Sequence, residues 1–174
     1  MDDVNPTLSH RNLPLLLLLA REAVIARFRP LLNAHGLTEQ QWRILRLLVT
    51  VDSLEPRQIT GLCGISSPSL AGILARMAEQ GLVKRESLAH DRRRQAVSAT
   101  AKGRRLAVRM APGIEAVYAA LEAQLGTEVV ARLDATLGTV LRTLEAEPQE
   151  ADSVDARPLV SKIAFGVGPT RDVG

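Results

Sequence analysis

Four stretches of this chain carry apolar residues three and four positions apart, the spacing that places side chains on one face of an α-helix. The first two stretches carry Leu17, Ala20, Val24, Phe28 and Leu31, and then Trp42, Ile44, Leu45, Leu48 and Val49. The last two carry Leu106, Met110, Ile114, Val117, Leu121 and Leu125, and then Val130, Leu133, Leu137, Val140, Leu141 and Leu144. The pattern predicts four helices with one apolar face each, and we expect the face of the first helix to be buried.

Residues suited to a first helical turn mark where these helices begin. Pro14 lacks the N–H group that a first turn leaves unpaired. Thr38 and Gln41 have the spacing of a capping box, and Thr100 is expected to cap the long third helix.

Prolines inside two of these helices predict irregularities. Pro30 is expected to kink the first helix or end it early, because proline removes a backbone hydrogen bond. Pro112 with Gly113 is expected to bend the third helix.

Between the second and third apolar stretches lies a helix-turn-helix pattern. A short helix near 57–62 is followed by a turn. Ser66, Ser67 and Pro68 then open a second helix with a serine cap and a first-turn proline, and Gly81 ends it. We interpret this second helix as a recognition helix, which would lie in the major groove of DNA.

A basic hairpin follows directly. Strand-like segments at 82–88 and 95–99 flank a charged turn at 89–93. Together the elements predict a mainly α fold, a winged helix-turn-helix with a short β-hairpin wing and long N- and C-terminal dimerisation helices.

The chain is divided accordingly into an arm, one domain and a tail. The predicted parts are a flexible arm (1–11), a domain (12–146) and a disordered tail (147–174); within the domain lie a DNA-binding lobe (about 38–100) and dimerisation helices (about 12–35 and 101–146). The apolar faces of the outer helices have no sheet to cover, which favours a homodimer over packing within one chain.

Charge is concentrated rather than spread. The net charge is only +3, and aromatic residues make up 2% of the 174 residues. Between residues 76 and 109, however, ten Lys or Arg face three Asp or Glu, an excess of seven positive charges. A polyanionic partner suits this window, although a solvated charged face is the alternative.

Other function classes have little support. With Cys63 as the single cysteine, no internal disulfide is possible, and we expect a cytoplasmic protein. The apolar run at 13–20 is shorter than the ~20 residues of a membrane span. The histidines His10, His35 and His90 are scattered, and no metal spacing or phosphate loop is present, so we expect no enzyme, metal or cofactor.

Candidate DNA contacts on the recognition helix are Ser66, Ser67, Ser69 and Gly72, whereas Leu70, Ile73, Leu74 and Met77 are expected to pack inward. Serine hydroxyls can bind phosphates or base edges; alternatively the serines only cap the helix. Arg76 is expected either to reach a phosphate or to pair with Glu79.

The wing supplies the other candidate DNA contacts. Asp91 suits the turn, and Arg92, Arg93 and Arg94 follow it. One of these arginines can enter the minor groove while the others bind phosphates. A solvated basic turn is the alternative.

These segments resemble the MarR family of transcriptional regulators. The segment 91–103 is similar to the family's Asp-x-Arg wing and the Leu-Thr-x-x-Gly that follows it, with Ala99 in place of the leucine. The segment 68–83 is similar to its recognition helix, and the resemblance covers about 12–146. Segments 20–23, 28–31 and 37–46 resemble the branch that regulates homoprotocatechuate degradation. The resemblance implies a homodimeric repressor of aromatic-acid catabolism that binds a pseudo-palindromic double-stranded operator and is released by a small aromatic effector.

In proteins of this family the effector pocket lies between the dimer helices and the DNA-binding lobe. Candidate lining residues here are Arg21, His35, Trp42, Arg43 and Arg46. An arginine can bind a carboxylate with two hydrogen bonds, and the indole can stack on a phenol ring. Alternatively Trp42 belongs to the core and Arg21 pairs with an acid of a partner subunit.

The sequence is also compatible with three other functions. They are a regulator that answers a different phenolic ligand, an oxidant-sensing regulator that uses Cys63, and a winged-helix adaptor that binds protein instead of DNA.

Overall fold

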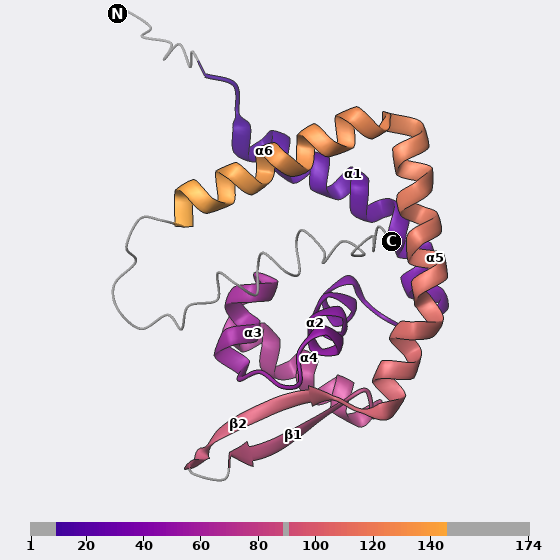
Figure 1. The fold of residues 1–174 in the computed structure, drawn as a ribbon. Coiled ribbons are helices and arrows are strands. Elements are labelled where there is room, and N and C mark those ends of the chain that lie inside the picture. The colour runs from indigo at the N-terminus through magenta and orange to yellow at the C-terminus, as the bar shows by residue number, and fades with distance from the viewer. Residues whose placement is uncertain (1–9, 89–90, 146–174) are drawn as a thin grey trace, which may run out of the picture.

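The computed structural model describes residues 10–88 and 91–145, with the backbone alone at residues 88, 91–93 and 145. In chain order the elements are α1 (Leu13–Ala34), α2 (Glu39–Thr50), α3 (Pro56–Cys63), α4 (Ser67–Glu79), β1 (Val83–Leu88), β2 (Asp91–Ala99), α5 (Ala101–Leu125) and α6 (Thr127–Glu145). Helices α2, α3 and α4 and the β1–β2 hairpin form a winged lobe, and α5 runs from that lobe toward α6 at the opposite end of the molecule (Figure 1).

The winged lobe contains most of the buried apolar side chains. Helix α4 packs against α2 and α3, and the most deeply buried side chains include Ile44, Leu45, Leu48, Ile59, Leu70, Leu74, Met77 and Val97. Strands β1 and β2 pair antiparallel, with Val83 opposite Ala99. An isolated bridge from Leu54 to Val97 ties the segment before α3 to the hairpin.

The predicted helix starts are confirmed. The Gln41 amide donates to Thr38 Oγ1 at 3.2 Å and the Thr38 amide to Gln41 Oε1 at 2.9 Å, which completes the capping box of α2. The Gly103 amide donates to Thr100 Oγ1 at 3.0 Å at the start of α5. Pro14 lies in the first turn of α1.

The two internal prolines do not end their helices. Helix α1 continues through Pro30 to Ala34, so the prediction of an early end is wrong. Phe28 and Leu32 are buried on either side of Pro30, and this packing holds the helix past the missing hydrogen bond. Helix α5 likewise continues through Pro112. A Cβ at Gly113 would lie 2.9 Å from a Leu31 methyl, so this glycine allows α1 to pack closely on α5.

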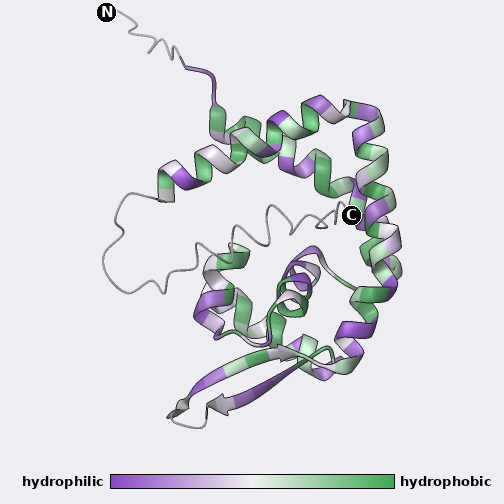
Figure 2. Ribbon diagram, in the orientation of Figure 1, coloured by the Kyte–Doolittle hydropathy of each residue, from purple (hydrophilic) through white to green (hydrophobic). Residues whose placement is uncertain are grey.

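The predicted buried face of α1 is only partly correct. Phe28 is buried and Leu31 is half-buried, but Leu17 is 41% exposed because the N-terminal half of α1 extends beyond its own lobe. Figure 2 shows that half of α1 as strongly apolar. At the far end of α5, Leu125 is also exposed.

The wing turn is shorter than predicted. Strand β2 begins at Asp91, opposite Leu88, so the backbone of 91–94 lies in a strand and not in a turn. The register shifts between Ser87 and Leu88, and in the described pairing residues 92–94 have no Cα partner in β1. Such an irregularity interrupts the ladder of hydrogen bonds between the two strands.

Some expectations fall outside the described residues. These are the flexible arm up to residue 9 and the tail at 147–174. Within 10–88 and 91–145 no single helix is long and apolar enough to cross a membrane; α3 and α4 reach that length only when counted together, across a bend of 109°.

Candidate nucleic-acid interface

Helix α4 has one buried and one exposed face. Leu70, Ile73, Leu74 and Met77 are at most 2% exposed and hold the helix on the lobe. Spacings of three and four residues place Ser69, Gly72 and Arg76 on the opposite, exposed face. The predicted division between inward and outward residues is therefore confirmed.

The serine at the start of α4 does not cap the helix through its side chain. Ser66 is the N-cap residue, yet its hydroxyl donates to Ser69 Oγ at 3.0 Å and makes no hydrogen bond to the backbone of the first turn. The interpretation that these serines only cap the helix is therefore not supported for Ser66. Exposed hydroxyls beside backbone N–H groups at a helix start suit a phosphate.

Arg76 is exposed, and its side chain extends along α4 toward the N-terminus of the helix. An ideal Cβ built on Gly72 would be 3.6 Å from Arg76 Nη1. No ion pair joins Arg76 to any residue in the described part of the chain, so of the two alternatives for Arg76 the structure does not form the pair with Glu79. The physical reason is the direction of the side chain, which extends toward the N-terminus of the helix, whereas Glu79 lies toward the C-terminus.

Two arginines attach the wing to the helix-turn-helix. Arg85 Nη2, from β1, donates to the Ala71 carbonyl of α4 at 3.2 Å. Arg94, from β2, donates through Nε to Glu55 Oε2 at 3.1 Å and through Nη2 to Glu55 Oε1. Glu55 is the N-cap residue of α3, so this bidentate pair fixes β2 against α3.

The same pair controls the ionisation of Glu55. Hydrogen bonding and charge from Arg94 lower the pKa of the Glu55 carboxyl from its usual 4.5. Arg94 was predicted as a DNA contact, and the structure also gives it this role within the protein. The side chains of Asp91, Arg92 and Arg93 lie outside the described residues.

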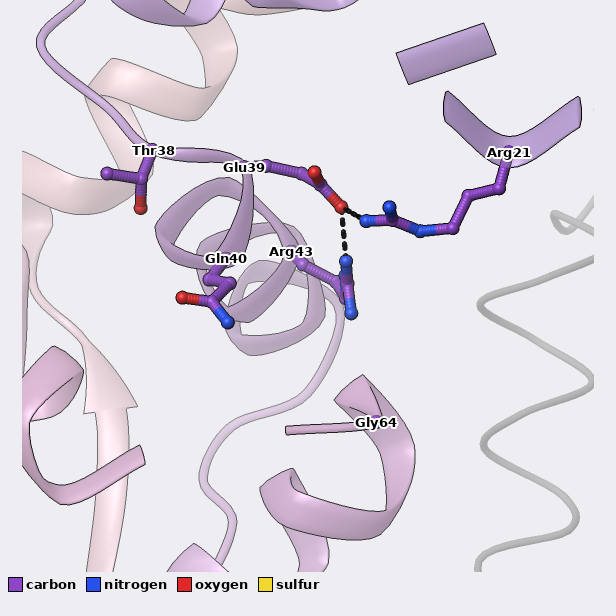
Figure 3. A pocket seen from close by; sticks show the side chains of 6 residues that line it. All are labelled: Arg21, Thr38, Glu39, Gln40, Arg43 and Gly64. Atoms are coloured by element: carbon purple, nitrogen blue, oxygen red, sulfur yellow. Dashed lines mark hydrogen bonds and ion pairs between the residues drawn. The ribbon is translucent and has the colours of Figure 1, made fainter. Parts of the chain in front are cut away.

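Of the five predicted effector residues, the structure brings Arg21 and Arg43 together. Both guanidinium groups bind Glu39 Oε1, at the start of α2 (Figure 3). They line a cavity of about 400 Å³ with Thr38, Gln40 and Gly64. Arg43 also donates to the Cys63 carbonyl, so the cluster links α1, α2 and the end of α3.

The other three effector candidates lie elsewhere. His35 Nδ1 is 2.9 Å from the Leu31 carbonyl, and Trp42 is half-buried against the core. Arg46 Nη1 donates to Tyr118 Oη at 3.1 Å, and this joins α2 to α5.

Tyr118 was missed by the sequence reasoning. Its ring meets Phe28 edge-on, with ring centroids 5.0 Å apart and an interplanar angle of 65°. Tyr118 is the single tyrosine of a chain with 2% aromatic residues. That scarcity was the available signal, but Tyr118 is 72 positions from Arg46, so the sequence alone did not pair them.

Cys63 is buried, and burial raises the pKa of its thiol to about 11 despite the opposing charge of Arg43. Its thiol therefore stays protonated near neutral pH. The described residues contain no group of three His, Cys, Asp or Glu side chains able to hold a metal ion.

A helix with one buried face, a preceding helix-turn and a basic hairpin fixed beside it define a winged helix-turn-helix protein. A model of the MarR family matches residues 35–94. The homoprotocatechuate degradative operon repressor of Escherichia coli is 41% identical over 124 residues, which cover 71% of this chain and 84% of that repressor. The chain belongs to the MarR family of transcriptional regulators, and the predicted family and fold are confirmed.

Two solved structures of similar proteins include a partner molecule. NadR in complex with 4-hydroxyphenylacetate has a TM-score of 0.66 and 36% identity, covering 76% of this chain and 94% of NadR. The transcriptional repressor CouR bound to a 23-mer DNA duplex has a TM-score of 0.69 and 25% identity, covering 74% of this chain and 92% of CouR.

Proposed function

We propose that this protein is a homodimeric repressor that binds a pseudo-palindromic DNA operator of an aromatic-acid catabolic operon and leaves it when a small phenolic carboxylate binds. The observation that carries the proposal is the exposed face of α4, which Arg85 of β1 ties to the wing. This face combines small side chains with Arg76, which has no ion-pair partner in the described part of the chain. The similarity to an operon repressor and to a repressor bound to DNA supports it.

The second subunit is expected to cover the apolar surfaces of the outer helices. Residues 12–35 and 101–146 would form the dimerisation part, and 38–100 the DNA-binding lobe. Leu16 and Leu18 in α1 and Leu133 and Leu144 in α6 are 42–71% exposed in the single chain. Contact between two copies would remove this surface from water and set the spacing of the two recognition helices.

The best-supported effector site is the cluster around Arg46. Its guanidinium can bind the carboxylate of the effector with two hydrogen bonds. Tyr118 Oη can form a hydrogen bond with the carboxylate or with the phenol hydroxyl of the effector. Trp42 precedes Arg46 by one helical turn and Phe28 packs on Tyr118, so aromatic surface borders the cation. Arg21 and Arg43 share the Glu39 carboxylate and line a separate cavity, and His35 lies against the Leu31 carbonyl, so we do not include these three residues in the proposed site.

Release would follow from a population shift. The Arg46 cluster joins α2 of the lobe to α5 of the dimerisation part. An effector bound there would favour one relative position of the two parts, and DNA would favour another, so that each weakens the binding of the other.

We propose further that the protein acts in the cytoplasm by binding and not as an enzyme. An adaptor that uses the winged fold to bind protein is the competing function. It predicts that exchange of Arg92 and Arg93 for glutamate leaves partner binding intact, whereas a repressor would lose its operator. Arg94 is kept in this test because it holds the wing on Glu55.

Fluorescence anisotropy of the full chain on its own upstream intergenic DNA and on a scrambled duplex tests the proposal. We expect tight, salt-dependent and sequence-selective binding that 4-hydroxyphenylacetate or homoprotocatechuate weakens. Arg46→Gln should retain DNA binding and lose the response, while Arg29→Gln, which removes an ion pair with Glu22 inside α1, serves as the matched control. The titrations are made at a low and a high salt concentration. Equal binding to the upstream DNA and to the scrambled duplex at both concentrations would contradict the repressor function.

A further inference from the structure

The exposed face of α4 carries a glycine that the protein itself does not require. Gly72 lies in the interior of the helix, where glycine costs stability relative to alanine. Its φ is not in the left-handed region, and a Cβ there would make only an ordinary contact, 3.6 Å from the flexible end of Arg76. Neither backbone strain nor packing therefore accounts for this glycine.

The neighbours of Gly72 make the same face unusually shallow. Ser69, Ala71 and Ala75 are exposed beside it, and their side chains are short. Arg76 is the one long cationic side chain among the exposed residues of α4. A shallow helix surface lets the backbone approach base edges closely, and a single arginine can then reach the floor of the groove.

The direction of Arg76 adds a further observation. The Arg76 guanidinium lies over Gly72. Gly72 is about one helical turn, or ~5.4 Å, closer to the N-terminus of α4 than the Cα of Arg76 is. The N-terminal residues of a recognition helix are those that contact bases. No acidic side chain in the described residues neutralises Arg76, so its donors are available to a nucleic acid.

We propose that Gly72 and Arg76 form one base-reading unit, in which the missing side chain at Gly72 lets the α4 backbone approach the base edges, so that the Arg76 guanidinium beside it can donate two hydrogen bonds to a guanine in the major groove. The proposal rests on the DNA-binding function proposed above. It separates Arg76 from the wing arginines: Arg76 selects sequence, while the wing contributes affinity.

Selection of duplexes from a randomised library tests this, with the full-length wild type, Arg76→Ala, Arg76→Lys and Gly72→Ala compared. The wild type should select one guanine in each half-site. Arg76→Ala should lose that preference by about 10-fold or more and Arg76→Lys should weaken it, because a bidentate contact is lost. Binding to non-specific duplex should change little in either variant.

Gly72→Ala gives the sharper separation of folding from recognition. The melting temperature should rise by about 2–4 °C, while the preference for the guanine falls. Gly61→Ala is the matched control, since Gly61 is an exposed helical glycine of α3 with nothing within 4 Å of an added Cβ. It should raise stability and leave the selected sequence unchanged.

Three outcomes would overturn the proposal. If the Gly72 and Arg76 variants select the wild-type site with every preference unchanged, Arg76 does not read a base. If Arg76→Ala weakens all duplexes equally, Arg76 is a phosphate contact. If the wild type itself selects no sequence, the DNA-binding function fails and this inference fails with it.

Discussion

Leucine side chains lie in two opposite environments in this molecule. In the winged lobe, Leu45, Leu48, Leu70 and Leu74 are 0–2% exposed. In the N-terminal half of α1, the six leucines at 13 and 15–19 are 41–58% exposed. The lobe completes its own core within one chain, whereas the outer helices present an apolar surface that the second chain of the proposed dimer would cover. In that dimer the two regions would be stabilised by different events, folding in one and association in the other.

The strongest test of this contrast is to place a charge on the outer helices. Leu16→Lys combined with Leu133→Lys should convert the dimer to a monomer, because a desolvated ammonium is costly at an apolar interface. Loss of the second half-site contact should weaken operator binding about 100-fold to 10,000-fold. Sedimentation and anisotropy measure the two effects. Glu115→Gln, at an exposed position of α5, is a control; an equal loss there would contradict the assignment.

The lobe should respond in the opposite way. Leu48→Ala removes a fully buried side chain and should lower the free energy of unfolding by about 2–5 kcal/mol, without dissociating the folded dimer. Urea unfolding at several protein concentrations measures this. Val108→Ala, at a position 74% exposed, should cost less than about 0.5 kcal/mol. Comparable losses in both variants would remove the distinction between the regions.

The Glu39 cluster is where the two regions meet, and its contribution should be smaller. Arg21 of α1 and Arg43 of α2 share the Glu39 carboxylate, and the side chains are partly exposed. A double-mutant cycle with Arg21→Met and Glu39→Gln should give a coupling of about 0.2–1 kcal/mol that falls with added salt. Strictly additive effects would mean that α1 and the lobe are not coupled through this pair.

The smallest effect concerns the pair that fixes the wing. The pKa of Glu55 is lower in the folded protein than its usual 4.5, so the ionised carboxylate stabilises the fold above that pH. The contribution should be lost as the pH falls below 4.5 through the lowered pKa. Titration by NMR should show the Glu55 pKa returning toward 4.5 in Arg94→Gln. An unchanged Glu55 titration in that variant would show that Arg94 is not the cause.

Local sequence signals predicted the elements well. The capping box at Thr38, the cap at Thr100 and the serine–proline start of α4 each depend on residues within three positions, and the structure has all three helices where expected. The inward face of α4 followed from helical spacing in the same way. The boundary of the wing did not, because the start of β2 depends on pairing with β1 rather than on the charge of 91–94.

The site depended on contacts that no local pattern contains. Tyr118 meets Arg46 across 72 positions, and Arg94 meets Glu55 across 39. Arg76 has a possible partner three positions away in Glu79, yet the structure directs it toward Gly72. Short-range proximity along a helix permits a pair but does not select it, since the side chain's direction and its other neighbours decide.

The sequence by itself determined the helices, their caps, the winged helix-turn-helix order and the family, because these depend on periodicity and on short motifs. Only the tertiary structure decided which apolar faces are buried within one chain and which arginines are engaged inside the protein. Burial and ion pairing depend on residues that are distant in the chain and meet only after folding. Leucines on helices therefore form a closed core in the lobe and an open surface on α1.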